Sequence, residues 1–447
     1  MNRGGTNYIW LFLLGLGSGL RVHIIGLIGL SELVVFVLSP ILFLRHMDEF
    51  KKAGFMTFYN LIFMMIVGSL MSSVYNHTWM FASIKNCAVL YSIFAYSVVL
   101  FLLLRKSFAG IGWLFAGCFV ASIIVVWAFN TAIHVDASIG TAELADSTVE
   151  EMVTGVRFWN TRITAALRLP IVAETYLHWP LAYPLIALPI AAIVSLVLSV
   201  SGRSDALISM FAFILIAVAG KSRKKMMFLG RHMFLFFFGL LLVAAVCKRA
   251  YKYTAINGYL GEDARAKYYG QTKQGDSIMR LLMAGRAEFF IGMRAIMDHP
   301  IMGFGTMAPD DKGYWANFMW NYADYEDYDL FRRLNERREQ YGGRLLIPVH
   351  SYIVGFWGQS GIVGLFFSLY IFYLLFQFFK YYVRCIPHWY GFFACTIPAL
   401  GWSMFFSPYG HGVVMPMLFT GLLMARAVGK GWLQLPVEME LEARRYE

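Results

Sequence analysis

Long apolar runs dominate the chain, and short basic connections or two longer polar stretches separate them. Several of the runs exceed the roughly 18 residues that let a helix cross a bilayer. We expect membrane-spanning helices near residues 8–20, 24–44, 57–74, 81–104, 108–130, 179–201, 204–220, 226–247, 350–379, 387–406 and 411–427. The predicted fold is all-α, a polytopic membrane protein with about 11–12 transmembrane helices and one long, partly helical external loop.

The composition of the chain is that of a membrane protein. Of its 447 residues, 59% are apolar and 15% are charged. A soluble domain carries about a quarter charged residues, so the composition argues against a water-soluble enzyme. The five cysteines lie within or at the edges of apolar runs and form no CxxC pair, which argues against a disulfide framework or a zinc site.

The positive charge of the chain indicates its topology. The formal net charge is +11, but the polar stretches 131–178 and 248–349 hold most of the acids and fewer than half of the bases. The other bases lie mostly on short connections, where positive charge marks the cytoplasmic side, so we exclude nucleic-acid binding. The connections 45–52 and 105–106 and the C-terminal tail then face the cytoplasm, and both polar stretches face the outside.

The number of crossings between the two polar stretches conflicts with this orientation. Three apolar runs separate the stretches, and an odd number of crossings would place them on opposite sides of the membrane. Either one run is a half-span, or a crossing inside 221–250 is missing from the prediction. The conflict concentrates on the basic cluster Lys221–Lys225, and both solutions stay open.

An ordered series of short motifs is the most specific signal in the chain. In chain order the motif residues are Ser222-Arg223, Arg286, Pro300 with Gly303 and Gly305, His350-Ser351, and Gly361 with Gly364. This series resembles the bacterial O-antigen ligase and Wzy-type polysaccharide polymerase superfamily. The resemblance covers about 220–365 by motif, and the rest of the chain only by its many-spanned layout.

The resemblance implies a division of the chain and a reaction. The division is an N-terminal helical region at 1–220, an O-antigen ligase-like catalytic region at 221–365 with the loop 248–349, and a C-terminal helical region at 366–447. The implied reaction is that of an inverting, metal-independent glycosyltransferase without a cofactor. Its donor is an undecaprenyl-pyrophosphate-linked oligosaccharide, and its acceptor is a glycan on the outer, periplasmic face of a bacterial inner membrane. Membrane lipids and other polysaccharide-assembly proteins are the further partners that we expect.

The acceptor would distinguish two enzymes of this kind. A polysaccharide polymerase extends another lipid-linked repeat unit, whereas an O-antigen ligase uses lipid A core, and both share the motifs. We favour the polymerase because it is the more numerous use of this architecture. A transporter or flippase of precursors is the alternative from another class, and Glu32 and Arg231 are the main charges inside spans that would serve it.

His350 is the candidate catalytic residue. It ends a polar stretch and opens an apolar run, so we expect it at the boundary between water and membrane. An imidazole with an ordinary pKa near 6.5 can accept a proton at neutral pH, and the resemblance implies that His350 activates the acceptor hydroxyl. The alternative is an interfacial histidine that hydrogen-bonds a carbonyl. Ser351 stands where the family more often has Asn, which leaves open what orients His350.

Arginines are the candidate ligands of the donor. Arg286 and Arg223 could hold the pyrophosphate through the planar guanidinium fork, and Arg344 is a weaker candidate, as is Arg294. The alternative for Arg286 is an ion pair with Glu288. The alternative for Arg223 is a topological anchor among the neighbouring lysines.

Two other features carry less weight. The acidic tract 324–329 contains the Asp327-x-Asp329 triplet, which could hold a divalent cation, but a solvated and self-paired surface explains it better. His411 lies in a predicted outer turn, where a structural role is the simpler interpretation. We therefore expect no metal site.

Overall fold

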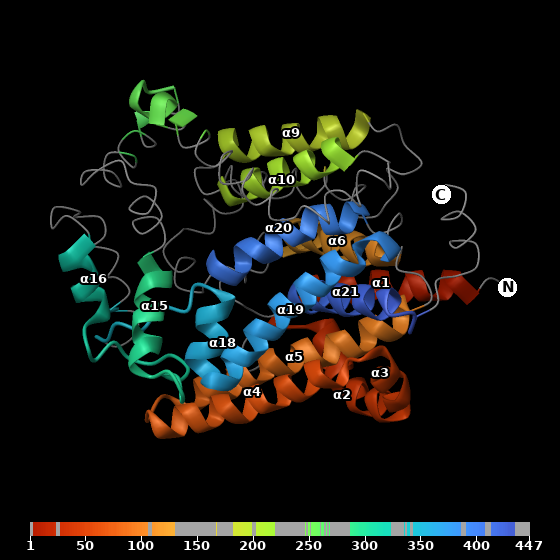
Figure 1. Cartoon of the computed structure of the whole chain (residues 1–447), viewed down its shortest axis with the longest axis horizontal. Coiled ribbons are helices and arrows are strands. Elements are labelled where there is room, and N and C mark those ends of the chain that lie inside the picture. Colours follow the sequence, from red (N-terminus) through yellow and green to blue (C-terminus); the bar gives the residue numbers. More distant parts are fainter. Residues whose placement is uncertain are drawn as a thin grey trace.

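The computed structural model of the chain is drawn in Figure 1. It describes residues 3–23, 27–105, 110–129, 167, 182–198, 203–219, 246, 249–250, 252–259, 261–262, 265, 268, 287–322, 335, 338–339, 343–385, 390–406 and 413–433. The basic cluster 221–225 and, apart from single residues, the predicted span 226–247 and the stretch 131–178 lie outside these residues. The number of crossings between the two polar stretches therefore stays a prediction.

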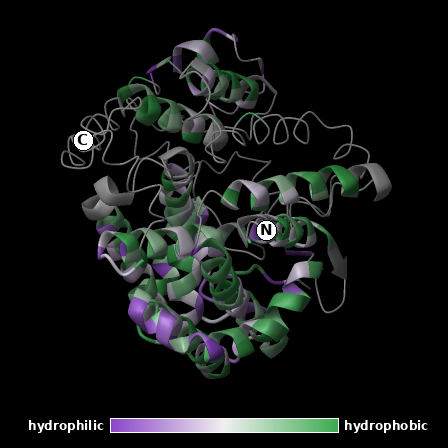
Figure 2. Cartoon of the chain, turned by 90° about the vertical axis from the view of Figure 1, so that its right-hand side faces the viewer, coloured by the Kyte–Doolittle hydropathy of each residue, from purple (hydrophilic) through white to green (hydrophobic). Residues whose placement is uncertain are grey.

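The described residues form mainly apolar helices. They are α1 (Arg3–Gly19), α2 (Leu30–Arg45), α3 (Met47–Ala53), α4 (Met56–Tyr75), α5 (Met80–Leu104), α6 (Ile111–Phe129), α9 (Ala182–Leu198), α10 (Arg203–Ala219), α15 (Ala287–Asp298), α16 (Tyr314–Tyr322), α18 (Tyr352–Ser360), α19 (Ile362–Cys385), α20 (Tyr390–Phe406) and α21 (Val414–Gly429). Hydrophobic residues predominate along most of the helices coloured in Figure 2. The helical class is confirmed.

Two helices among the described residues, α4 and α5, are long and apolar enough to cross a membrane. The pair α2 and α3, which bends by 79° at its break, would make a third span. Shorter apolar helical segments of 10–17 residues lie within α6, α9, α10, α19, α20 and α21. These helices are those of a helical membrane protein, while the number of its crossings stays a prediction.

The chain between α1 and α2 is a β-hairpin. Strands β1 (Arg21–His23) and β2 (Leu27–Gly29) pair in antiparallel fashion, with Val22 opposite Ile28. The predicted span 24–44 is therefore wrong at residues 27–29, because β2 occupies them and the helix begins at Leu30. As a result Glu32, which we expected inside a span, lies in the first turn of α2. Its carboxylate accepts a hydrogen bond from the Gly29 amide at 3.1 Å, where the helix dipole favours a negative charge.

The predicted span 350–379 is two helices. Gly361 separates α18 from α19 and has a φ of 64°, which an L side chain rarely adopts. A Cβ at Gly364 would lie 1.8 Å from the Phe356 carbonyl oxygen, so α19 folds back close against α18. One continuous helix was the simpler expectation, because the apolar run itself has no break.

The centre of the bundle joins the N-terminal and C-terminal regions of the chain. Helix α4 packs against α5, α18 and α19, while α21 packs against α19 and α5. Phe58 of α4 contacts the rings of Phe367 and Phe419. The described core therefore crosses the boundaries at 220 and 365 that the motifs suggested.

The two ends of α4 lie in different surroundings. At its start, α3 contacts α21, and Glu49 of α3 pairs with Arg105 at the end of α5. At its end, Asn76 hydrogen-bonds Gly303, which follows α15. A helix of 20 residues is about 30 Å long, so the segment after α15 lies at the end of α4 opposite the basic connection. Figure 1 shows this separation, with α15 and α16 on the left and α3 on the right.

Candidate functional site

The predicted site lies only partly among the described residues. His350 is partly exposed and directly precedes Ser351, the N-cap of α18. Arg344 is exposed in the segment 343–351 that leads to it. Arg286 and Arg223 lie outside the described residues, as do Asp327, Asp329 and His411. Their roles stay predictions.

Ser351 holds the backbone next to His350. Its hydroxyl accepts a hydrogen bond from the Val354 amide at 2.9 Å, and the residue is fully buried. Serine and asparagine are both favoured at this position because either side chain can satisfy a free amide of the first turn. Ser351 thus supplies the cap that Asn would supply. It fixes where α18 begins, and with it the backbone that carries His350.

Helix α15 packs directly on the segment that carries His350. A Cβ at Gly292 would lie 2.5 Å from Val354 Cγ1 and 2.7 Å from the Pro348 carbonyl oxygen. The absence of a side chain at Gly292 therefore permits the contact. Because α15 begins at Ala287, Arg286 directly precedes the helix that lies against residues 348–354.

The turn after α15 docks on the end of α18. Gly303 and Gly305 have φ angles of 74° and 85°, in the left-handed region that favours glycine. This conformation aims two successive amides, those of Phe304 and Gly305, at the Gly358 carbonyl oxygen, at 2.7 and 3.0 Å. A Cβ at Gly303 would lie 2.4 Å from the same oxygen. The left-handed backbone at Gly303 and Gly305 thus permits the contact between the turn and the Gly358 carbonyl oxygen.

A second set of hydrogen bonds closes the same junction. The Ile362 amide donates to the Ile301 carbonyl at 2.8 Å, and the Trp357 indole donates to the Pro300 carbonyl at 2.8 Å. The structure therefore brings together the motif residues Pro300–Gly305 and Gly358–Gly364. The order of the motifs along the chain could not show that these two are in contact.

A small apolar core supports the segment before His350. It contains Ile291, Ala295, Ile296, Phe304, Ala308, Tyr314, Trp315, Ile347 and Val354. Asp310 accepts hydrogen bonds from the Tyr314 and Trp315 amides and so caps α16. The Trp315 indole donates to the Leu346 carbonyl at 3.0 Å, which ties α16 to the chain that leads to His350.

The sequence did not single out the polar group at the end of α15. Tyr314 donates to the Asp298 carboxylate at 2.8 Å, and the Lys312 ammonium lies 3.5 Å from the same oxygen. The Tyr314 hydrogen bond and the Lys312 charge lower the pKa of Asp298. Burial and the charge of Lys312 lower the pKa of His299, against the opposite effect of Asp298. The Asp298-His299 pair before Pro300 was the available sequence signal.

The described groups around His350 are suited to proton transfer. Among the described residues, no three His, Cys, Asp or Glu side chains lie close enough to hold a metal ion. His350 is partly exposed just before the cap of α18, and Arg294 and Arg344 are exposed on neighbouring segments. Such a surface can take a proton from a hydroxyl and attract an anionic substrate.

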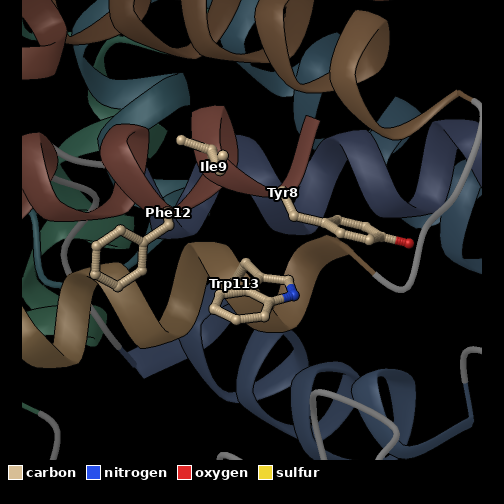
Figure 3. Close-up of a pocket in the computed structure, with 4 residues that line it drawn as sticks. All are labelled: Tyr8, Ile9, Phe12 and Trp113. Atoms are coloured by element: carbon tan, nitrogen blue, oxygen red, sulfur yellow. The ribbon is translucent and has the colours of Figure 1, made fainter. Parts of the chain in front are cut away.

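A separate cavity of about 300 Å³ lies between α1 and α6. Figure 3 shows the Tyr8 and Phe12 side chains of α1 on either side of Trp113 of α6, and Ile9 also lines the cavity. Its lining is nearly all apolar, and it contains none of the predicted site residues. This cavity is a feature of the helix surface and does not locate the chemistry.

Comparison of the chain with known protein families, with curated proteins and with solved structures finds no match. The proposed function therefore rests on the geometry of the site and on the motifs.

Proposed function

We propose that the protein is an inverting, metal-independent glycosyltransferase that uses an undecaprenyl-pyrophosphate-linked oligosaccharide at the outer face of a bacterial inner membrane. Within this class we propose a polysaccharide polymerase. The observation that supports it best is the docking of Pro300–Gly305 on Gly358–Gly364, which unites separate motifs of the resemblance around one short helix. That helix, α18, begins directly after His350.

In the proposed reaction His350 accepts the proton of the acceptor hydroxyl. The hydroxyl oxygen attacks the anomeric carbon from the face opposite the pyrophosphate, the bond from carbon to pyrophosphate oxygen breaks, and undecaprenyl pyrophosphate leaves. The configuration at the anomeric carbon is thereby inverted. Arg286, Arg223 and Arg344 are the proposed ligands of the pyrophosphate, whose negative charge grows as the bond breaks.

The position of the described site relative to the basic connections supports an external reaction. The turn 299–305 lies at the end of α4 opposite the connection 45–52. If the basic connection is cytoplasmic, as the positive-inside rule predicts, the turn faces the periplasm. The lipid-linked donor would then be used after its transfer across the membrane.

The direct test is transfer by the purified protein in lipid nanodiscs. The native protein with an undecaprenyl-pyrophosphate oligosaccharide should make longer lipid-linked glycans and release undecaprenyl pyrophosphate. His350→Ala should insert normally but transfer glycan about 10²–10⁴-fold more slowly, which is the usual contribution of general-base assistance. His46→Gln, which removes an imidazole at the other end of α4, should retain near-native transfer.

Three results would overturn elements of this proposal. Product made only on lipid A core would identify a ligase rather than a polymerase. Movement of the donor across vesicles without any glycan product would identify a transporter. Near-native transfer by His350→Ala would remove His350 as the base.

A further inference from the structure

The short connection between α4 and α5 is a docking point for the turn 299–306. The Asn76 amide nitrogen donates to the Gly303 carbonyl at 3.0 Å and to the Ser72 carbonyl of α4 at 2.8 Å. Both partners are acceptors, so the amide must present its NH₂ group, the only donor that an asparagine side chain has. One side chain thus bridges segments that lie 227 positions apart in the chain.

Neighbouring contacts reinforce this bridge. The Thr306 amide donates to the Ser73 hydroxyl at 3.4 Å. A Cβ at Gly305 would lie 2.9 Å from Thr78 Oγ1, so the backbone of the turn rests on the connection. His77, next to Asn76, has a φ of 52°, and a residue other than glycine keeps this conformation only where its surroundings enforce it.

The bridge leads to the proposed catalytic helix. Asn76 holds the Gly303 carbonyl, and the next two amides, of Phe304 and Gly305, hold the Gly358 carbonyl of α18. Helix α18 has nine residues, so Gly358 and the cap at Ser351 belong to one short rigid rod of about 14 Å. A shift of the turn therefore moves the backbone that carries His350.

We propose that Asn76 is a positioning residue for glycan transfer. It acts through the turn and α18 and sets the place of His350 without touching the substrate. This inference rests on the proposed function. Asn76 lies outside the motif region 220–365. The inference therefore gives the N-terminal helices a defined role in the reaction.

Asn76→Asp tests the hydrogen bonds with little change of shape. An ionised carboxylate has no donor and would face two carbonyl oxygens, so the bridge should open. Asn76→Gln keeps the NH₂ donors on a longer side chain. It should therefore retain part of the native restraint of the turn and part of the native transfer rate. The matched control is Asn257→Asp, because the Asn257 amide makes the same local bond, to the Tyr253 carbonyl at 2.8 Å, and bridges no second segment among the described residues.

Two measurements on these variants in nanodiscs decide the question. Hydrogen exchange of the Phe304 and Gly305 amides should be at least about tenfold faster in Asn76→Asp, since their opening would no longer be restrained. The kcat for transfer should fall about 10–100-fold with KM nearly unchanged, as a misplaced catalytic group predicts. Asn257→Asp should change neither quantity.

The outcomes distinguish a failure of this inference from a failure of the proposed glycosyltransferase function. Native exchange in Asn76→Asp would show that the bridge does not hold the turn and would overturn the inference. Faster exchange with native kcat would reduce Asn76 to a structural contact and would also overturn it. Absence of transfer in the native protein would instead overturn the proposed function, whatever the exchange of the variants.

Discussion

The two ends of the α4–α5 pair are built in different ways. Near α3 the interior is aromatic, and the interlocking rings are those of Phe43, Phe50, Phe55, Tyr59, Phe94 and Phe101. Toward the turn 299–306 the interior is polar, and its buried side chains are Ser69, Ser72, Ser73, Ser83 and Asn86. The same two helices thus change from ring packing to hydrogen bonding along their length.

The two ends differ in what their contacts contribute: one stabilises the bundle, and the other orients the segment packed on it. Ring packing depends on filled volume, because the attraction between many atoms is individually small and collectively large. Hydrogen bonds depend on direction and distance, so they define how two segments are placed. The polar end contacts the turn 299–306 beside the proposed site, through Asn76 and Ser73. We infer that the aromatic end stabilises the bundle, while the polar end orients the turn 299–306.

The largest expected effect on stability lies at the aromatic end. Phe50 is fully buried among the rings of Phe43, Phe55, Tyr59 and Phe101. Phe50→Ala should lower the free energy of unfolding in detergent by about 3–5 kcal/mol, because it opens a cavity. Hydrogen exchange in the turn 299–306 should stay native at temperatures where the variant is folded.

The control for Phe50 is a phenylalanine whose side chain is largely exposed. Phe366 of α19 is 53% exposed, so Phe366→Ala removes the same side chain without opening a cavity. Equal losses in the two variants would contradict the distinction between the two ends.

A smaller effect is expected where the turn meets α18. Gly303→Ala places a Cβ 2.4 Å from the Gly358 oxygen on a backbone with φ of 74°. Gly343 has a similar φ of 86° with no atom within 4 Å of such a Cβ, so Gly343→Ala isolates the backbone cost. We expect Gly303→Ala to be the more destabilising of the two by about 1–3 kcal/mol in thermal unfolding. Equal losses of stability in the two variants would mean that the turn can move away from Gly358 without cost.

A hydrogen bond inside the polar end should contribute less. The Ser83 hydroxyl donates to the Ser73 hydroxyl across α4 and α5, whereas the Ser92 hydroxyl donates to the Val89 carbonyl of its own helix. Ser83→Ala should cost about 0.6 kcal/mol, the mean found for bonds between membrane helices. Ser92→Ala should cost less in the same unfolding measurement. The reverse order would show that the bond between the helices does not stabilise their packing.

The smallest expected effect is a dependence of stability on pH in the segment that contains Asp298 and α16. The pKa of Asp298 is lowered, so its contribution to stability is present above the ordinary carboxyl pKa of about 3.9 and is lost as the pH falls through the lower folded value. The native protein should resist limited proteolysis near α16 better than Asp298→Asn at pH 6. This advantage should shrink below about pH 4. An advantage unchanged at low pH would contradict the role of the Asp298 carboxylate.

Much of the candidate site depends on contacts that no local pattern contains. The apolar run 350–379 predicted a helix but could not predict its break, because Gly361 is one glycine among several. The break exists where the Ile301 carbonyl accepts the Ile362 amide, a contact between distant segments. The cap at Ser351, in contrast, follows the ordinary preference of serine for a helix start and was within reach of sequence reasoning.

The sequence by itself determined that the protein is built of apolar, membrane-type helices, because a run of apolar residues long enough to cross lipid must satisfy its backbone internally as a helix. It also determined which end of α4 is basic. The tertiary structure alone decided the hairpin before α2, the fold of α18 against α19 and the docking of the turn on Asn76. The hairpin and the fold of α18 against α19 consist of backbone pairings and close backbone approaches that an apolar run does not specify. The docking on Asn76 joins positions 227 apart in the chain and arises only when the helices have packed.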